Sequence, residues 1–474
     1  MEKKNLIFIM CDQMTGQVLD DDSDYLMPNL RALAEEGIKV ERAYAPNPIC
    51  SPSRASLMTG TLPHTHGMVD VTHAVPEYRA EYNYSLDTFS SILKENSYAT
   101  SYYGKWHVER RHCLDKFGYD EFVTEREIPA PHYTAIDKTI ISNPGTGYPD
   151  KAIGGVYKEG AEASDEHFLF NKAIDFIDRK KDGPFFTFIS TNAPHDPYTV
   201  PKEFYDMYSE IDLPISFEDD MTDKPAIYRR IREVFSVLSK EDYKKIRRYY
   251  HAYCSLIDSE IGRLVKYLKS NNLYDDTMIV FLSDHGDLQG AHGLICKGVP
   301  GFEEGYRIPL VFKLPGNKNG GFTTSDIFSV VDIAPTVLKI LGLRNLRGKI
   351  DGIDKCSSLE GEKHDYAVVA ENHGQRYSYT QRIIWKGSKK YIFNGFDYDE
   401  FYDLEKDPYE MHNAINDKEY QEDVKKLCSE LQRVVFETKD TTLGDAVYFM
   451  HRFLPVGPRK EAGTSEFKIY NKEF

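Results

Sequence analysis

The sequence predicts an α/β protein with a large mixed, mostly parallel β-sheet sandwiched by helices, followed by a smaller α+β domain. Three observations lead to this fold class. Short apolar runs alternate with helical patterns through the first three quarters of the chain, which is typical of parallel strands joined by crossover helices. The pattern changes beyond about residue 345. The length of 474 residues and the 41% of hydrophobic residues suffice for two domains with buried cores.

Five apolar runs predict the strands of the large sheet. Each run is short and rich in β-branched and aromatic residues, as buried strands are. The runs cover residues 6–10, 99–103, 185–190, 277–282 and 310–313.

Helix signals fill the intervals between these runs. One helix is expected from Pro28, a residue favoured in the first turn, to a stop at Gly37. A second is expected from Ser164 to the Gly-Pro pair at 183–184. A third begins with Ser239 and Asp242 in capping-box spacing and carries an apolar stripe. Residues 201–232 lack clear periodicity and predict a long insertion near the mouth of the functional site.

The second part of the chain is expected to form the smaller domain. Residues 390–393 alternate as a strand does, and residues 419–435 have the pattern of a charged amphipathic helix. We therefore expect a larger domain at residues 1–345 and a smaller α+β domain at residues 346–474.

Charge and composition argue against several classes of protein. With 75 Asp and Glu against 59 Lys and Arg, the formal net charge is −16, so the broad basic face of a nucleic-acid-binding protein is missing. The opening apolar run, residues 6–11, is too short for a signal-peptide core or a membrane span. We expect a soluble cytoplasmic protein without membrane or nucleic-acid partners, unless a leader was trimmed. The seven scattered cysteines argue against a disulfide framework.

Polar side chains follow four of the predicted strands, at the point where each strand ends. Open α/β sheets bind ligands at the carboxyl ends of their strands, so these residues are candidates for a single pocket. A single such residue is more often a helix cap or turn former, but four strands together favour a site. The residues are Asp12, Lys105, His107, His195, Asp284 and His285.

These side chains are suited to a metal and an anion. Asp12, Asp284 and His285 supply oxygen ligands and an imidazole, which fit Ca²⁺, Mg²⁺ or Mn²⁺ better than a structural zinc. The alternative for residues 284–287 is a hydrogen-bonded turn. A cationic group beside the metal would form a compact site for a tetrahedral oxyanion. That group is expected to contain Lys105, His107, His195 and Lys297.

The strongest local signal lies between Cys50 and Gly60. Pro52 and Ser53 favour the start of a helix that ends near Gly60, which would place Cys50 at the positive end of the helix, where anions bind. From its residues alone, Cys50 is either an activated thiolate or a buried cysteine.

This segment, Cys50-x-Pro52-Ser53-Arg54 followed by Leu57-Met58-Thr59-Gly60, resembles the signature of the type I sulfatase family, whose fold is alkaline-phosphatase-like. In that family the cysteine is oxidised to formylglycine by a dedicated maturation enzyme. The resemblance covers residues 5 to about 430. It extends to Asp12-Gln13, Gly104-Lys105-Trp106-His107, Ala193-Pro194-His195, Ser283-Asp284-His285-Gly286, Lys297, Arg307-Ile308-Pro309-Leu310 and Phe401-Tyr402-Asp403-Leu404.

The resemblance implies hydrolysis of a sulfate monoester, of a carbohydrate or another small organic molecule. A hydrated formylglycine made from Cys50 has one hydroxyl that attacks sulfur and a second whose collapse to the aldehyde expels sulfate. One divalent metal is implied, Ca²⁺ before Mn²⁺ or Mg²⁺, held by Asp12, Cys50, Asp284 and His285. Asp284 would also share in activating the diol.

Carried over by position, the resemblance implies a role for each of the remaining residues. Arg54 would hold the diol, and Lys105 and Lys297 would bind sulfate oxygens. His107 would assist collapse of the hemiacetal. His195 would be the general acid for the departing oxygen.

Two further hypotheses stay open at this point. Family members often carry two aspartates where this chain has Asp12-Gln13, which weakens the preference for Ca²⁺. Gln13 together with His285 also resembles the branch of the superfamily that hydrolyses phosphonate monoesters and phosphodiesters, whereas the block around Lys105 favours sulfatases. The third hypothesis is a non-catalytic anion or glycan binder in which Cys50 remains a thiol. The sequence carries no signal for an oligomeric state.

Overall fold

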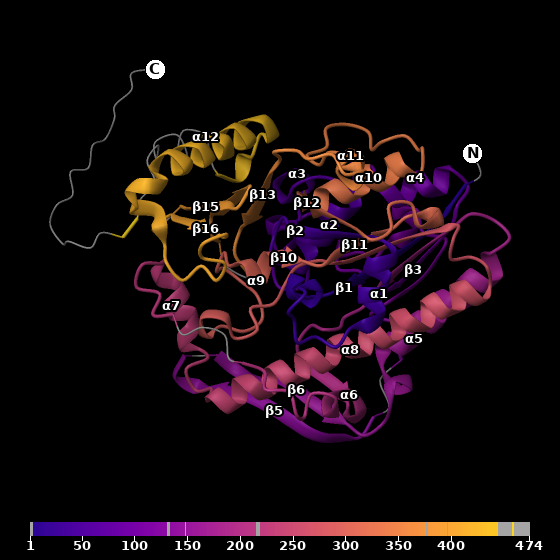
Figure 1. Cartoon of the computed structure of the whole chain (residues 1–474), viewed down its shortest axis with the longest axis horizontal. Coiled ribbons are helices and arrows are strands. Elements are labelled where there is room, and N and C mark those ends of the chain that lie inside the picture. Colours follow the sequence, from indigo (N-terminus) through magenta and orange to yellow (C-terminus); the bar gives the residue numbers. More distant parts are fainter. Residues whose placement is uncertain are drawn as a thin grey trace.

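Figure 1 shows how helices and strands are arranged in the computed structural model, which describes residues 3–129, 133–146, 148–214, 219–375, 378–395, 397–443 and 457–458. The described residues form a large sheet with the strand order β10-β2-β11-β9-β1-β7-β3-β4, and β12 also pairs with β2. The strands are β1 (Asn5–Cys11), β2 (Ile38–Tyr44), β3 (Ala99–Gly104), β4 (Glu121–Thr124), β7 (Phe185–Ser190), β9 (Thr277–Ser283), β10 (Arg307–Ile308), β11 (Leu310–Lys313) and β12 (Phe322–Ser329).

The centre of this sheet is parallel. Strand β1 pairs in parallel with β7 and β9, so that Phe8 is in register with Phe188 on one side and with Val280 on the other. Every residue of β1 is buried, as expected for a strand covered on both faces. Strand β11 runs antiparallel to β9 and β2, which makes the sheet mixed. The predicted fold class is confirmed.

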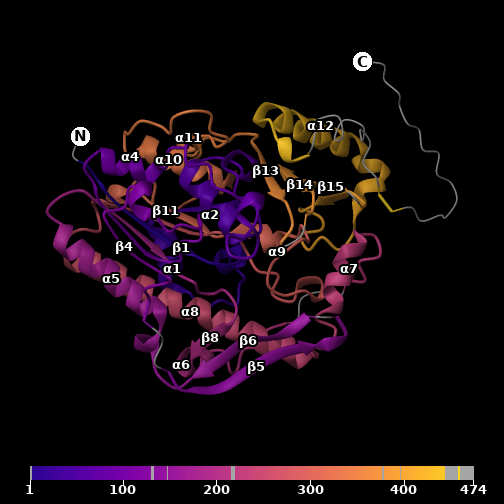
Figure 2. The same ribbon diagram turned by 180° about the vertical axis from the view of Figure 1, so that it is seen from behind.

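Helices cover both faces of the sheet (Figures 1 and 2). Alternate residues of a strand point to opposite faces, and those of β1 divide between two core clusters accordingly. Ile7 and Ile9 pack with α1 (Pro28–Glu36), α5 (Asp165–Lys180) and α8 (Lys240–Ser270). Leu6 and Phe8 pack with α2 (Cys50–Thr59), α4 (Phe89–Glu95) and α10 (Ile333–Ile340).

The locally encoded elements match the sequence predictions. The five predicted strands are β1, β3, β7, β9 and β11, and the three predicted helices are α1, α5 and α8. Gly37 follows the end of α1, the hydroxyl of Ser164 accepts the His167 N–H in the first turn of α5, and Ser239 with Asp242 forms the expected capping box. Strands β2, β4 and β12 were not predicted, because their polar residues interrupt the apolar runs.

The stretch at 201–232 contains more regular structure than its sequence indicates. It holds α6 (Lys202–Asp206) and most of α7 (Ala226–Glu233). A three-stranded sheet before it was not predicted and consists of β5 (Ala135–Asn143), β6 (Tyr148–Tyr157) and β8 (Tyr198–Pro201). The Tyr228 hydroxyl of α7 donates to Glu400 Oε1 at 2.8 Å, so this stretch contacts the C-terminal part of the chain.

The C-terminal part contains an antiparallel sheet covered by one long helix. The strands are β13 (Ala367–Asn372), β14 (Gln381–Lys386), β15 (Lys389–Asn394) and β16 (Glu400–Asp403), and the helix is α12 (Gln421–Thr438). The Tyr44 ring stacks on Trp385 with 4.4 Å between ring centroids, which joins this part to β2.

The domain boundary expected at residue 345 stays a prediction. The remaining α-helices are α3 (Pro63–His66), α9 (Glu303–Tyr306) and α11 (Cys356–Leu359). None of the described helices combines the length and apolarity needed to cross a membrane.

Candidate active site

Cys50 is the first residue of α2, at the end where the helix exposes unpaired N–H groups. The helix ends at Gly60, which has a φ of 64°, as the sequence predicts. Cys50 is 2% exposed, and its Sγ lies 3.4 Å from His107 Nδ1 and 3.7 Å from Lys297 Nζ. Burial alone would raise the pKa of the Cys50 thiol, but the ammonium groups of Lys297 and Lys105 lower it below its usual value. The segment is therefore built to hold a negative charge at position 50.

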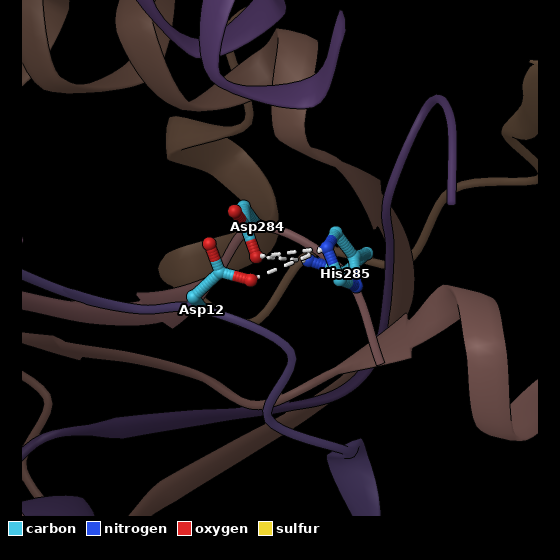
Figure 3. A group of neighbouring side chains, drawn as sticks. All are labelled: Asp12, Asp284 and His285. Atoms are coloured by element: carbon cyan, nitrogen blue, oxygen red, sulfur yellow. Dashed lines mark hydrogen bonds and ion pairs between the residues drawn. The ribbon is translucent and has the colours of Figure 1, made fainter. Parts of the chain in front are cut away.

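A second group of side chains joins the ends of β1 and β9. Asp12 follows β1, and Asp284 and His285 follow β9 (Figure 3). His285 Nε2 lies 3.5 Å from Asp12 Oδ1 and 3.6 Å from Asp284 Oδ1, and one ligand atom from each residue falls within 4.8 Å of the others. The predicted convergence of residues about 270 positions apart is therefore seen in the structure.

This group fits a divalent cation. Asp12 Oδ1 is buried and has no hydrogen-bond partner, although a buried carboxylate oxygen is rarely left unpaired. The His285 Nδ1 lies 2.9 Å from the carbonyl oxygen of Gly286, so Nδ1 carries the proton and Nε2 presents its lone pair to the two carboxylates. A carboxylate oxygen without a hydrogen bond and an imidazole lone pair that converge on one point are donors of the kind that hold a metal.

Arg54 lies beneath this group and is 1% exposed. Its Nε donates to Asp284 Oδ2 at 2.7 Å, and its Nη2 to Asp12 Oδ2 at 3.2 Å. A third nitrogen, Nη1, donates to Ser190 Oγ at 2.6 Å. Burial alone would lower the pKa of Arg54, but the carboxylates of Asp284 and Asp12 raise it, so the guanidinium stays charged. Arg54 thus orients both carboxylates and balances part of their charge.

Two lysines complete the cationic side of the site. Lys105 Nζ lies 2.6 Å from Asp12 Oδ2, and Lys297 Nζ lies 2.9 Å from His285 Nε2 and 3.8 Å from Asp12 Oδ1. Burial alone would raise the pKa of Asp12, but these two ammonium groups lower it well below its usual value. The site therefore holds ionised carboxylates and cations together, away from solvent.

Two further histidines belong to the site, His107 beside Cys50 and His195 within the field of the two lysines. Burial and the ammonium of Lys105 lower the pKa of His107, whose Nδ1 contacts Cys50. Burial, with Lys297 and Lys105, lowers the pKa of His195 to about 3. His195 Nδ1 lies 2.5 Å from the carbonyl oxygen of Asp196. The proton of the neutral ring is therefore on Nδ1, and Nε2 is an acceptor.

In the sequence, Gln13 stood out as a departure from the family pattern at the metal group, and the structure gives its contacts. Its backbone has a φ of 69°, and its N–H donates to Asp284 Oδ1 at 3.0 Å. Its Nε2 donates to Asp287 Oδ2 at 2.5 Å and to Asp196 Oδ1 at 3.2 Å. Its Oε1 is buried and has no hydrogen-bond partner. Gln13 is therefore a further candidate ligand. Its two partners, Asp196 and Asp287, were not among the predicted site residues, although both stand in the polar turns that follow predicted strands.

The comparisons with known proteins agree with this geometry. A family model described as sulfatase matches residues 4–343, and one described as the C-terminal part of N-sulphoglucosamine sulphohydrolase matches residues 290–437. The chain belongs to the sulfatase family. Its reaction is the hydrolysis of a sulfate ester. The family resemblance inferred from the motifs is thereby confirmed.

Curated relatives of this sulfatase match most of its length. The choline-sulfatase of Rhizobium meliloti is 29% identical over 436 residues, which is 87% of this chain and 82% of that protein. The arylsulfatase of Clostridium perfringens is 29% identical over 455 residues, which is 89% of this chain and 92% of that protein.

Solved structures share the fold. The phosphonate monoester hydrolase of Silicibacter pomeroyi superposes with a TM-score of 0.78 at 21% identity, covering 93% of this chain and 97% of that one. A protein in complex with its substrate D-glucosamine-2-N, 6-O-disulfate superposes with a TM-score of 0.73 at 23% identity, covering 94% of this chain and 99% of that one.

Proposed function

We propose that this sulfatase cleaves the sulfate monoester of a carbohydrate or another small organic molecule, using a formylglycine made from Cys50. The observation that carries the proposal is the position of Cys50 Sγ, between His107 Nδ1 at 3.4 Å and Lys297 Nζ at 3.7 Å, at the start of α2. A nucleophile there faces a cationic, buried site suited to a tetrahedral anion. The substrate class is supported by a structural neighbour in complex with a disulfated glucosamine.

Asp12, Asp284 and His285, with residue 50, would hold the metal, and Gln13 Oε1 is a candidate for a further ligand. Oxygen-rich donors of this kind favour Ca²⁺, with Mn²⁺ or Mg²⁺ as alternatives. When bound, the metal would lower the pKa of the diol at position 50 and neutralise sulfate oxygens.

The cations of the chain bind and orient the substrate. The side chains of Lys105 and Lys297 are each 7% exposed and carry their ammonium groups on flexible stems. Each ammonium group can therefore leave its contact with Asp12 and bind a sulfate oxygen instead. Arg54 keeps its contacts to Asp284 and Asp12 and holds the carboxylates in place. Arg54 is therefore a positioning residue.

The two histidines are proposed to move protons. His107 Nδ1 is in reach of residue 50 and would take the proton when the hemiacetal collapses. His195 is neutral in the free site, so a general acid at this position must first gain a proton on Nε2. A bound sulfate ester offsets the charges of Lys105 and Lys297, which lower the pKa of His195, and would thus favour protonation.

The maturation enzyme decides whether this chemistry is available, so the test combines conversion and turnover. The chain is expressed with and without a formylglycine-generating enzyme, the peptide containing residue 50 is analysed by mass spectrometry, and hydrolysis of an aryl sulfate and of a carbohydrate sulfate is measured. Turnover should rise in proportion to converted Cys50. Fully converted protein that hydrolyses neither sulfate would contradict the proposal, and equal turnover without conversion would remove Cys50 from the mechanism. Cys50→Ala should abolish turnover and leave the fold intact. Its matched control is Cys356→Ala, which changes a cysteine outside the site and should keep turnover.

A phosphonate monoester or phosphodiester hydrolase is the second candidate. The observation that favours it is Gln13, an amide at the metal group where many sulfatases carry a second aspartate, and two phosphonate monoester hydrolases share the fold. An aryl phosphonate assayed in parallel separates the two, because preferential hydrolysis of the phosphonate would replace the sulfatase proposal. If the protein is a non-catalytic binder with an unconverted Cys50, it should bind the sulfated ligand and show no turnover.

We also propose that the chain is divided into two domains, at residues 1–345 and 346–474.

A further inference from the structure

The amide of Gln13 lies between two buried carboxylates. Its Nε2 donates to Asp287 Oδ2 at 2.5 Å and to Asp196 Oδ1 at 3.2 Å, so both hydrogens of the amide are used. Gln13 and Asp287 are 0% exposed, and Asp196 is 6% exposed. Neither carboxylate belongs to the metal group or to the catalytic residues proposed above, so their common contact with Gln13 needs a separate explanation.

The backbone of Gln13 is held as well. Its N–H donates to Asp284 Oδ1 at 3.0 Å, and its carbonyl oxygen accepts from the Tyr250 hydroxyl at 2.7 Å. In the part of the chain that the structure describes, Oε1 is the polar atom of this residue that has no hydrogen bond, and it is buried. Residue 13 is therefore fixed at its backbone and at Nε2, and Oε1 is the acceptor left for a ligand.

Other parts of the chain hold the two carboxylates in place. Asp287 Oδ2 accepts from the Tyr198 hydroxyl at 2.6 Å, and its Oδ1 accepts from the Gln289 N–H at 2.9 Å. Asp196 forms an ion pair with Lys151 of β6, which balances its charge. Both carboxylates thus have fixed positions that do not depend on the amide between them.

These contacts decide which end of the Gln13 amide faces which neighbours. The two ends of a glutamine amide have nearly the same shape, so the hydrogen bonds and not the packing distinguish them. With the amide turned over, Oε1 would meet the oxygens of Asp287 and Asp196. Two charge-assisted hydrogen bonds would then become two contacts between acceptors. The carboxylates therefore hold Nε2 on their own side and keep Oε1 away from it.

We propose that Asp287, supported by Asp196, is a positioning residue that presents Oε1 of Gln13 to the divalent cation. The inference rests on the metal site proposed above and states what orients one of its ligands. It also accounts for Gln13 at a position where many family members carry a second aspartate. A carboxylate at position 13 would lie against Asp287 and Asp196 and be repelled by both, so the amide at 13 and the carboxylate at 287 form a matched pair.

The first test exchanges the members of this pair and measures the melting temperature in EDTA at mildly alkaline pH. In Asp287→Asn, the new amide turns an N–H2 group toward one of the three donors around it, so the melting temperature should fall. It should also fall in Gln13→Glu, where two carboxylates meet. In the double variant the amide at 287 donates to the carboxylate at 13, so Asp287→Asn should raise the melting temperature of the Gln13→Glu chain.

The second test measures Ca²⁺ binding to the full chain by calorimetry, with the same conversion of residue 50 in every sample. An amide at position 287 can donate or accept, so it no longer selects the orientation of Gln13, and Asp287→Asn should weaken Ca²⁺ binding about tenfold or more. A carboxylate at position 13 has two equivalent oxygens, so the same substitution should cost clearly less in the Gln13→Glu chain. A loss caused only by the missing charge of Asp287 would be equal in both chains.

Asp258→Asn is the matched control. Asp258 is 2% exposed, and its carboxylate accepts from Asn29 Nδ2 at 2.8 Å and from the Leu30 N–H at 2.7 Å, outside the site. This substitution should lower the melting temperature equally in the unmodified and the Gln13→Glu chains, and it should leave the Ca²⁺ affinity unchanged.

The outcomes separate this inference from the metal site on which it rests. An unmodified chain that binds none of Ca²⁺, Mn²⁺ and Mg²⁺ would overturn the metal site and the inference with it. If the unmodified chain binds Ca²⁺ but Asp287→Asn has no effect, or the same effect in both chains, the inference is wrong and the metal site stands. If Asp287→Asn alone fails to fold, a double variant no more stable than Gln13→Glu would still overturn the inference.

Discussion

Replacing Arg54 with methionine tests how the carboxylates of the site are held. Methionine is shorter than arginine but similar in volume, and it carries no charge, so Arg54→Met removes the donors to Asp284 Oδ2 at 2.7 Å and to Asp12 Oδ2 at 3.2 Å with little change in volume. Both carboxylates are 0% exposed. Lys105 Nζ, at 2.6 Å, still pairs with Asp12, so the uncompensated charge falls mainly on Asp284.

The magnitude follows from burial. Removing one partner of a buried ion pair costs about 3–5 kcal/mol, because the other charge remains without compensation. The free energy of unfolding should therefore fall by about 3–5 kcal/mol in a chelator. A divalent cation at the two carboxylates supplies the missing positive charge, so the variant should bind Ca²⁺ more tightly than the unmodified chain and gain more stability from it, about 1.4 kcal/mol for each tenfold difference in Kd. The loss in Arg54→Met should thus be clearly smaller in excess Ca²⁺.

The assay is urea unfolding of both proteins, with EDTA and with Ca²⁺. Arg344→Met is the matched control, because Arg344 also contacts two carboxylates, Asp87 at 2.9 Å and Glu95 at 2.7 Å, but at the surface. It should cost less than about 1 kcal/mol in either buffer. A loss in Arg54→Met as small as in the control, or equal with and without metal, would refute this reasoning.

Three further predictions concern maturation, pH and the metal group. Because Cys50 is 2% exposed, a maturation enzyme should convert it during synthesis and not in the folded, purified protein. The test is mass spectrometry of purified protein treated with the enzyme, and conversion of Cys50 in that sample would disprove the prediction. Burial alone would lower the pKa of His64, but the Glu371 carboxylate raises it to about 9. The ion pair of His64 and Glu371 should therefore stabilise the fold fully below pH about 6.5, and this contribution should be lost as the pH rises through 9. In Glu371→Gln, the melting temperature should depend less on pH over that range. Gln13→Glu places a carboxylate against Asp196, so it should lower the melting temperature in EDTA more than in Ca²⁺; an equal shift in both buffers would speak against a metal there.

The sequence predicted the parts of the fold that depend on local pattern. Strand β1 is a continuous apolar run because it is covered on both faces, and α8 begins at a capping box that is visible in the letters. Strand β2 has no such signature, since Lys39 and Glu41 interrupt its apolar residues, and its pairing with β10, β11 and β12 depends on segments more than 260 positions away. Long-range pairing of this kind leaves little trace in one strand.

The polar residues that follow four predicted strands were visible in the sequence itself, and they identified Asp12, His195 and Asp284 as candidates for one site. The motif around Cys50 was visible as well and placed this residue with them through the family resemblance. The tertiary structure decided the rest. It turned the amide of Gln13 toward Asp287, left Asp12 Oδ1 without a hydrogen bond, and set neutral His195 beside two ammonium groups. Hydrogen-bond partners and pKa values depend on which buried groups meet and how much water is excluded, and that is settled only when distant segments pack together.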